Sequence, residues 1–177
     1  ALREKNLQVV NPDFEKLGLV EKDIDVFEAL EKEIRDYKPG VICISTVDPN
    51  HTFGMELLTH CKEVFPEIPT ICGGPLSTLV PDDIVQHDCV DIVGRGEAEE
   101  KLVELVDLLE KHGTSEEGWS KLYNIPNFWV KDKDYENNGI VHKNAVTLPD
   151  ISKGLPPDLS IFDPRHFLRP LGGRMYN

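Results

Sequence analysis

Short apolar runs that alternate with helical patterns constrain this sequence more than any other feature. Four runs rich in β-branched residues occur in the first half of the chain, and helical segments separate them. The runs are 7–10, 41–45, 68–72 and 89–93. Such alternation is typical of a parallel sheet whose crossover connections are helices. The sequence therefore predicts a doubly wound α/β fold with right-handed crossovers.

The helical patterns lie where these crossovers require them. Apolar residues recur at helical spacing over 26–37 and over 55–65, as in helices that bury one face. Pro81 opens a short third helix, since proline is favourable in a first turn. The clearest pattern covers 97–111, where an apolar stripe follows acidic residues that suit the positive end of a helix dipole. Each predicted strand is thus linked to the next by a helix.

The second half of the chain follows a different pattern. Segments 127–131 and 140–143 flank Asn137-Asn138-Gly139, and an Asn-Gly pair supplies the positive φ that a tight hairpin turn needs. We expect a β-hairpin appendage there. Proline and glycine then favour an extended connector over 148–177. The predicted organisation is an α/β domain over 1–112, followed by a hairpin and linker over 113–177.

The charge balance excludes several classes of partner. Asp and Glu number 32 against 19 Lys and Arg, which gives a net charge of −13. This field repels nucleic-acid backbones and anionic lipid, so we expect no nucleic acid and no membrane as partners. No apolar stretch approaches the roughly 20 residues of a membrane span. The four cysteines form no CxxC pair, as expected for reduced thiols in the cytoplasm.

Three loops are candidates for a binding site, because ligands in open parallel sheets lie beyond the carboxyl ends of the strands. Paired glycines let a flat ligand approach the backbone, and nearby hydroxyls can hydrogen-bond it. A tight turn explains the glycine pair equally well. We expect the loops to converge on one groove with the pair at its floor. The candidate residues are Ser45, Thr46 and Val47 in the first loop, Gly73, Gly74, Pro75, Ser77 and Thr78 in the second, and Gly94 and Gly96 in the third.

Motifs for phosphate binding and hydrolysis are absent from the sequence. GxGxxG does not follow the first run, and neither GxxxxGK[ST] nor GxSxG occurs. Glu97, Glu99 and Glu100 follow the third loop, where they would repel a phosphate from the start of the next helix. The acidic pocket of a signalling receiver domain is not visible either. We therefore expect no catalysis by this chain alone.

The amino-acid sequence around the three loops resembles that of cobalamin-dependent radical SAM enzymes. Ser45-Thr46-Val47, followed after 25 residues by Gly73-Gly74, is similar to the SxL and GG elements that accommodate the nucleotide tail of cobalamin. Segments 38–45, 73–81 and 90–99 look like the PDVVGIS, GGPHATLxPE and VDxVVRGEGE stretches of that family. The resemblance implies a flavodoxin-like, Rossmann-like cobalamin-binding domain. It also implies that the candidate loop residues bind this cofactor.

The sequence departs from the family pattern at several positions. Leu76 replaces the histidine of GGPH, and Ala98 replaces a glycine of GEGE. More important, DxHxxG, whose histidine is the lower cobalt ligand in the methionine-synthase type of domain, is absent. His51 begins an HxxG, but Asp48 lies one residue too far upstream, and a solvated loop histidine is the commoner case. We therefore expect no metal ligand in this chain. His51 is the one residue that would be a candidate if the chain supplied a cobalt ligand.

The resemblance further implies a larger parent protein. In it, this domain holds cobalamin against a radical SAM barrel of the same polypeptide that carries a [4Fe-4S] cluster and S-adenosylmethionine. Such a parent is a methyltransferase or a related enzyme that modifies carbon skeletons. The alternative is a vestigial flavodoxin-like module that serves only as a docking platform. Corrinoid absorbance of the full-length protein distinguishes the two.

The start of the chain resembles the end of the first helix and the second strand of the family's domain. The first strand would then precede residue 1. In the strand order 2-1-3-4-5 that strand lies between 7–10 and 41–45. We therefore expect either a gap of about 10 Å between these two runs or a strand contributed from outside this chain.

Overall fold

A computed structural model describes residues 25–150, 159–161, 169–171 and 174–176. The chain divides into two compact units, one over Phe27–Ile151 and one formed by the two ends of the chain. The second unit contains a two-stranded antiparallel pair, β6 (Arg169–Leu171) with β7 (Arg174–Tyr176), and a 3-10 turn at Leu159–Ile161. The expected connector is therefore not extended throughout.

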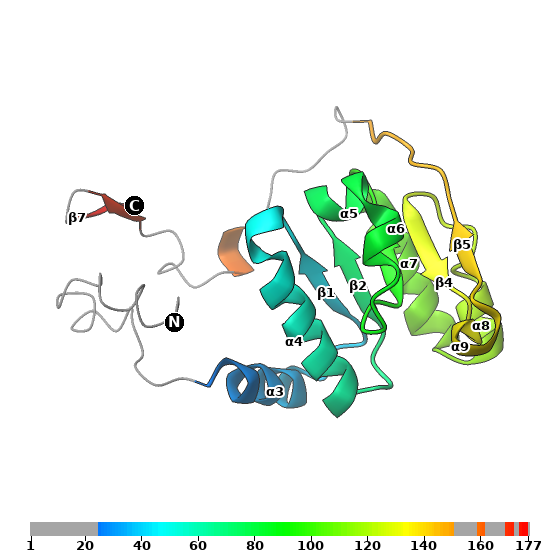
Figure 1. The fold of residues 1–177 in the computed structure, drawn as a ribbon, viewed down its shortest axis with the longest axis horizontal. Helices are drawn as coiled ribbons and strands as arrows, with labels where there is room; N and C mark the ends of the chain where they lie inside the picture. Colours follow the sequence, from blue (N-terminus) through cyan, green and yellow to red (C-terminus); the bar gives the residue numbers. More distant parts are fainter. Residues whose placement is uncertain (1–24, 151–158, 162–168, 172–173, 177) are drawn as a thin grey trace. The chain divides into compact units, whose positions relative to one another are not determined.

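One five-stranded sheet, in the order β1-β2-β3-β4-β5, forms the centre of the first unit (Figure 1). The first three strands are mutually parallel, and the last two are antiparallel. The parallel part confirms the predicted α/β fold. The strands are β1 (Ile42–Ser45), β2 (Thr70–Gly73), β3 (Ile92–Gly94), β4 (Phe128–Lys131) and β5 (Val141–Lys143).

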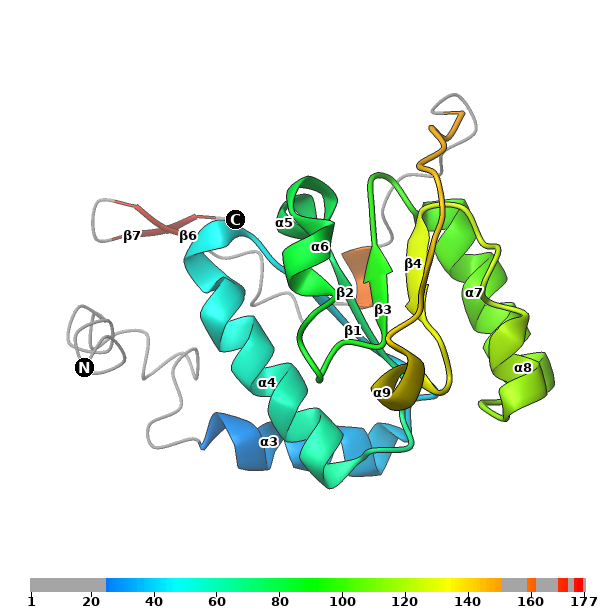
Figure 2. The ribbon, with the colours of Figure 1, turned by 45° about the vertical axis from the view of Figure 1, so that its right-hand side comes forward.

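Helices cover both faces of this sheet (Figure 2). On one face, α4, α5 and α6 pack over the parallel strands, and α3 packs against α4. On the other face lie α7 and α8. Compared with the predicted patterns, α4 begins earlier and α5 was not expected. The helices are α3 (Val26–Tyr37), α4 (His51–Val64), α5 (Pro75–Leu79), α6 (Pro81–Ile84), α7 (Glu99–His112), α8 (Glu116–Ser120) and α9 (Tyr135–Asn138), with a 3-10 turn at Asp48–Asn50.

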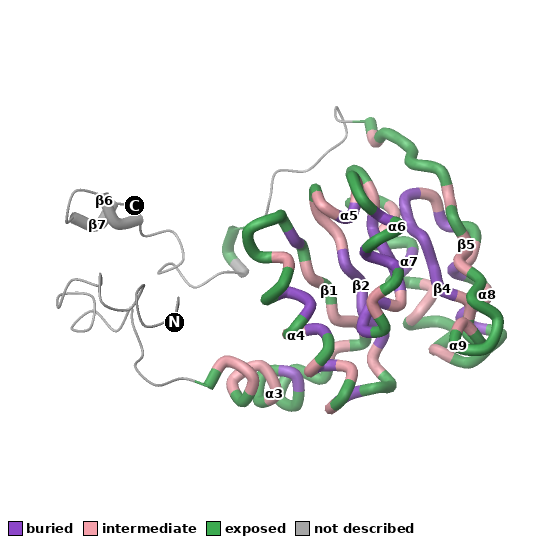
Figure 3. The backbone as a smooth tube through the Cα atoms, in the orientation of Figure 1, coloured by how far each residue is buried: buried purple, intermediate pink, exposed green. Residues whose placement is uncertain are grey.

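Neighbouring residues of each central strand enter two different cores. In β2, Ile71 joins the cluster that contains Leu105 of α7, whereas Cys72 joins the cluster that contains Leu58 of α4. Burial is concentrated along these strands (Figure 3). Because a parallel strand is covered on both faces, its sequence is apolar without alternation. This explains why short continuous apolar runs marked the strands.

The predicted hairpin is present, but it is not an appendage. β4 pairs with β3 and so extends the main sheet. The physical reason is that β4 is buried on both faces, with Phe128 in the α7 core and Trp129 in the α4 core. The connection to β5 is the short helix α9, which ends at Gly139 with φ 64°. Gly139 thus supplies the positive φ expected of the Asn-Gly pair, whereas Asn138 is the last residue of α9 and has no positive φ.

The outer edge of β1 has no strand partner within the described ranges. The order 2-1-3-4-5 assigns this position to the first strand of the domain. Segment 7–10 lies outside the described residues, so the expected gap stays a prediction. The division of the chain at residue 112 also stays a prediction. No helix in the described ranges is both long and apolar enough to cross a lipid bilayer.

Candidate functional site

The three predicted loops meet at the carboxyl edge of the parallel strands. Ser45 pairs with Gly73 across β1 and β2, and the register of β2 with β3 places Gly73 beside Gly94. Gly94 in turn pairs with Phe128 of β4. A groove of about 300 Å³ follows this row, and Gly74 and Gly96 also line it. The structure therefore brings together five of the candidate residues in one groove.

The wall of the groove is mainly apolar. Ile71 from β2, Leu102 from α7 and Phe128 from β4 line it. The exposed Cys43 lies two residues before Ser45 on the same side of β1 and also lines the groove. Ligand sites are commonly apolar clefts of roughly 300 to 1,000 Å³ with a few polar groups. The groove is at the lower end of this range, as suits a flat part of a larger ligand.

The two glycines of the second loop have different physical roles. Gly74 has φ 94°, and a Cβ there would lie 2.6 Å from Ser45 Oγ, so the fold itself requires glycine at this position. Gly73 does not have a positive φ. A Cβ on Gly73 would meet only Ile44 O at 3.9 Å and Gly94 O at 4.0 Å. Nothing in the fold therefore requires glycine at 73, and its missing side chain leaves the groove floor open.

Two candidate hydroxyls point into the protein rather than into the groove. Ser77 is buried, and its Oγ donates to Gly73 O at 3.2 Å. Thr46 is also buried, and its hydroxyl lies 3.7 Å from Cys72 Sγ. Thr46 N donates to Gly73 O at 3.0 Å. Both residues therefore support the loop around Gly73 and do not line the groove.

Thr78 connects the second loop to the third. Its Oγ1 donates to Gly74 O at 3.2 Å and accepts from Gly96 N at 2.8 Å. The remaining two candidates, Val47 and Pro75, are exposed and are not among the residues that line the groove. Thr78 is thus the candidate hydroxyl that sets the spacing of two groove loops.

Asn127 is a site residue that sequence reasoning missed. It is fully buried, with φ 70°. Its Nδ2 points at three carbonyl oxygens, those of Arg95, Glu97 and Thr147, at 3.2, 2.8 and 3.0 Å. Its Oδ1 accepts from the backbone and hydroxyl of Thr147. Asn127 therefore joins the third groove loop to the segment after β5. The only available signal was a polar residue, tolerant of positive φ, before an apolar strand.

His51 lies outside the groove. It lines a separate cavity along α4 together with Met55 and His87, and its ring centroid is 5.5 Å from that of His87. Desolvation lowers the pKa of His87, and the nearby His51 and Lys131 add to the effect. The described part of the chain contains no group of three or more His, Cys, Asp or Glu side chains that could hold a metal. The geometry gives no support to His51 as a cobalt ligand in the groove.

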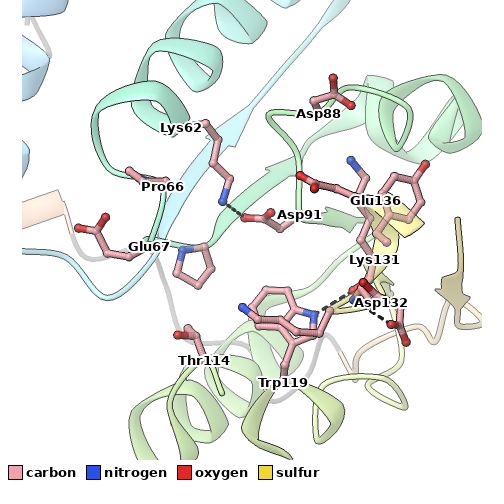
Figure 4. Close-up of a pocket in the computed structure, with 14 residues that line it drawn as sticks. Lys62, Pro66, Glu67, Asp88, Asp91, Thr114, Trp119, Lys131, Asp132 and Glu136 are labelled. Atoms are coloured by element: carbon pink, nitrogen blue, oxygen red, sulfur yellow. Dashed lines mark hydrogen bonds and ion pairs between the residues drawn. The ribbon is translucent and has the colours of Figure 1, made fainter. Parts of the chain in front are cut away.

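A third cavity, of about 320 Å³, lies at the opposite, amino edge of the parallel strands (Figure 4). Two of its lysines have partners within the protein. Lys62 Nζ lies 2.6 Å from Asp91 Oδ2, and the buried Lys131 donates to His87 O at 2.8 Å. Desolvation lowers the pKa of Lys131. Trp119 Nε1 donates to Lys131 O at 2.9 Å. These contacts join α8 to β4, and α4 and β4 to the segment before β3, so we assign the cavity a structural role.

Residues 1–106 match the family model of the B12 binding domain. The chain belongs to the B12 binding domain family. The matched region ends within α7 and so includes all three groove loops. The sheet, mostly parallel in its core and covered by helices, is consistent with the flavodoxin-like fold of B12 binding domains.

One curated relative is the anaerobic magnesium-protoporphyrin IX monomethyl ester cyclase of Cereibacter sphaeroides. It is 28% identical over 90 residues, which are 50% of this chain and 15% of the cyclase. The match therefore concerns only a small part of that enzyme.

The groove residues fit the nucleotide tail of cobalamin. An open glycine floor and apolar walls accept a flat aromatic base, and the exposed Ser45 offers a hydroxyl at one side. The acidic residues that begin α7, Glu99 and Glu100, are exposed and do not line the groove. The groove thus has an open floor and apolar walls, and neither of these carboxylates is buried beside it.

Proposed function

We propose that this chain binds cobalamin, with the nucleotide tail of the cofactor lying in the groove. The observation that carries the proposal is the glycine at position 73. Its backbone does not need glycine, and the space of its missing side chain belongs to the groove floor. A site kept open at a cost in chain entropy is expected where a ligand fills it. Membership of the B12 binding domain family names that ligand.

The residues of the site divide into two groups under this proposal. Gly73 and Gly94 form the floor, and Ser45 borders it. Gly74, Gly96 and the hydroxyls of Thr46, Ser77 and Thr78 keep the loops in place, with Val47 and Pro75 at their exposed ends. Bound cobalamin supplies the chemistry of its cobalt, typically the carriage of a methyl group. The protein orients the cofactor and excludes water from its tail.

We further propose that the parent protein is a cytoplasmic radical SAM enzyme, a methyltransferase or a related enzyme that modifies carbon skeletons. The likeness of the three loops to that family supports this proposal, as does the similarity to the cyclase of Cereibacter sphaeroides. In such an enzyme the barrel of the same polypeptide carries the [4Fe-4S] cluster and S-adenosylmethionine. The four cysteines here do not form CxxxCxxC, so the cluster ligands would lie outside this chain.

Thiol labelling tests the location of the ligand. Cys43 lines the groove and is exposed, whereas Cys61, Cys72 and Cys89 are buried. Desolvation of its sulfur raises the pKa of Cys43, so labelling is best done at alkaline pH. We expect hydroxocobalamin to slow labelling of Cys43 and the purified full-length protein to show corrinoid absorbance. A colourless protein whose Cys43 labels equally fast with and without hydroxocobalamin would support the docking-platform alternative.

A further inference from the structure

The segment that follows β5 returns to the edge of the sheet where the groove lies. β4 is antiparallel to β3, and β5 is antiparallel to β4. β5 therefore runs in the same direction as the parallel strands and ends at their carboxyl edge. Figure 1 shows the segment in orange as it leaves β5. We call residues 144–148 the strap.

Two asparagine side chains fasten the strap. Asn144 Nδ2, at its start, donates to Phe128 O at 2.7 Å. Further along, the backbone N and the hydroxyl of Thr147 both donate to Asn127 Oδ1, at 3.0 and 2.7 Å. Asn127 also donates from its own backbone N to Ala145 O at 3.0 Å. The far end of the strap is thus held by a single buried residue.

The strap also packs on the third groove loop. Val146 Cγ1 lies 2.8 Å from the position that a Cβ would take on Gly96, and Gly96 lines the groove. Asn127 Nδ2 points at the carbonyl oxygens on both sides of this glycine, those of Arg95 and Glu97. The same buried side chain therefore holds the strap with its oxygen and the loop with its nitrogen.

The orientation of the Asn127 amide depends on the strap. Within the described part of the chain, both donors to its Oδ1 belong to Thr147. Asn127 is fully buried, and a buried carbonyl oxygen that loses its donors lowers stability. Release of Thr147 therefore removes the contacts that orient the amide, and with it the hold on the third loop. A docked strap favours the loop arrangement that lines the groove.

The strap has the properties of a segment that opens locally. The side chains of residues 145–148 are exposed, and Leu148 is 87% exposed. Segments with few buried apolar contacts open at a low cost in free energy. The strap also lies close to the end of the first unit at Ile151, where the chain passes into the second unit. It is therefore the covalent route from the groove to that unit.

We propose that docking of the strap and occupancy of the groove by the cobalamin tail are thermodynamically coupled, so that the chain beyond residue 151 regulates cofactor binding. This inference rests on the proposed function and names its regulation. The groove binds the cofactor more tightly when the strap is docked, because the third loop is then ordered before the ligand arrives. Coupling between two sites is reciprocal, so the bound cofactor holds the strap in place.

Hydrogen exchange at the Thr147 amide tests this reciprocity in the purified protein. A ligand that binds only the docked state suppresses opening in proportion to its saturation. We expect hydroxocobalamin, at 100 times its Kd, to slow exchange at this amide at least tenfold. The Gly139 amide, which donates to Tyr135 O in the connection between β4 and β5, is the internal control. Its exchange should change less than about twofold.

Two neighbouring variants test the contact behind the coupling. Thr147→Gly removes the hydroxyl that binds Asn127, whereas Leu148→Gly adds the same chain freedom at an exposed position. Gly96 N donates to Thr78 Oγ1, so its exchange reports opening of the third loop. We expect Thr147→Gly to speed exchange at Gly96 about fivefold without cofactor and to weaken hydroxocobalamin binding about two- to fivefold. Leu148→Gly should change both less than about twofold.

The outcomes separate this inference from the proposed function. If the wild type does not bind hydroxocobalamin, both fail. If it binds but exchange at the Thr147 amide is unchanged, or slows no more than at Gly139, the coupling is wrong and cobalamin binding stands. Equal effects of Thr147→Gly and Leu148→Gly would also overturn the coupling. Near-ultraviolet circular dichroism shows whether each variant is folded, and Thr147→Val, which removes only the hydroxyl contact, replaces Thr147→Gly if that variant unfolds.

Discussion

Nδ2 of Asn127 donates to the carbonyl oxygen of Glu97 at 2.8 Å, across 30 residues of sequence. The same amide also reaches Thr147 in the segment after β5. One buried side chain thus replaces the backbone hydrogen bonds that two irregular loops cannot make with each other. The shape of the third groove loop depends on this contact.

Asn127→Ala should destabilise the protein by about 3 kcal/mol. The variant leaves buried carbonyl groups without donors and places alanine at a positive φ. Urea unfolding measures the loss, and Asn124→Ala, at an exposed position nearby, is the control. A loss below about 1 kcal/mol would show that the loops do not depend on Asn127.

Gly73→Val should weaken corrinoid binding without loss of stability, whereas Gly74→Ala should reduce stability. The Cβ of a valine at 73 makes only ordinary van der Waals contacts in a strand, so we expect a stable protein whose affinity for hydroxocobalamin falls about tenfold or more, because the side chain fills the groove. Alanine at 74 would lie 2.6 Å from Ser45 Oγ at φ 94°, which should reduce stability by about 2 kcal/mol. Thermal unfolding and absorbance titration measure the two effects. Full corrinoid occupancy in Gly73→Val would place the tail elsewhere.

Thr78→Val tests the connection between the second and third loops. The variant removes the acceptor of Gly96 N and the donor to Gly74 O. We expect faster hydrogen exchange at the Gly96 amide and a loss of about 1 kcal/mol in unfolding free energy. Thr52→Val, at an exposed position of α4, makes the same change without these contacts. Unchanged exchange at Gly96 would mean that Thr78 does not hold the loop.

Asp132 should contribute to unfolding at acidic pH. Hydrogen bonds from His142, the Asp134 backbone and Asn138 hold its pKa well below the usual range. The folded state therefore binds fewer protons than the unfolded state at acidic pH. The contribution of ionised Asp132 to folding stability is thus present above the usual carboxyl pKa and is lost as the pH falls below about 4. Asp132→Asn should flatten the fall in stability between about pH 4 and pH 2, measured by urea unfolding. Asp107→Asn, at an exposed position of α7, is the control. If stability falls with pH as steeply in Asp132→Asn as in the wild type and in Asp107→Asn, this role of Asp132 is wrong.

Much of the fold followed from local patterns. The parallel strands were predicted from continuous apolar runs, and α7 was predicted from an apolar stripe behind acidic residues. The position of β4 in the sheet was not predicted, because pairing with β3 depends on burial of both its faces by distant helices. Local periodicity contains no information about which strand edge a hairpin will join.

The sequence by itself determined that the strand ends carry glycines and hydroxyls, and that these loops meet at one edge, because parallel strands joined by helices place their carboxyl ends together. Only the tertiary structure decided the role of each residue. It separated Gly74, which the backbone needs, from Gly73, which leaves the groove floor open. It also placed the hydroxyl of Ser77 inside the protein, where it donates to Gly73 O. Distances between residues far apart in the chain decide these roles, and no local sequence pattern specifies such distances.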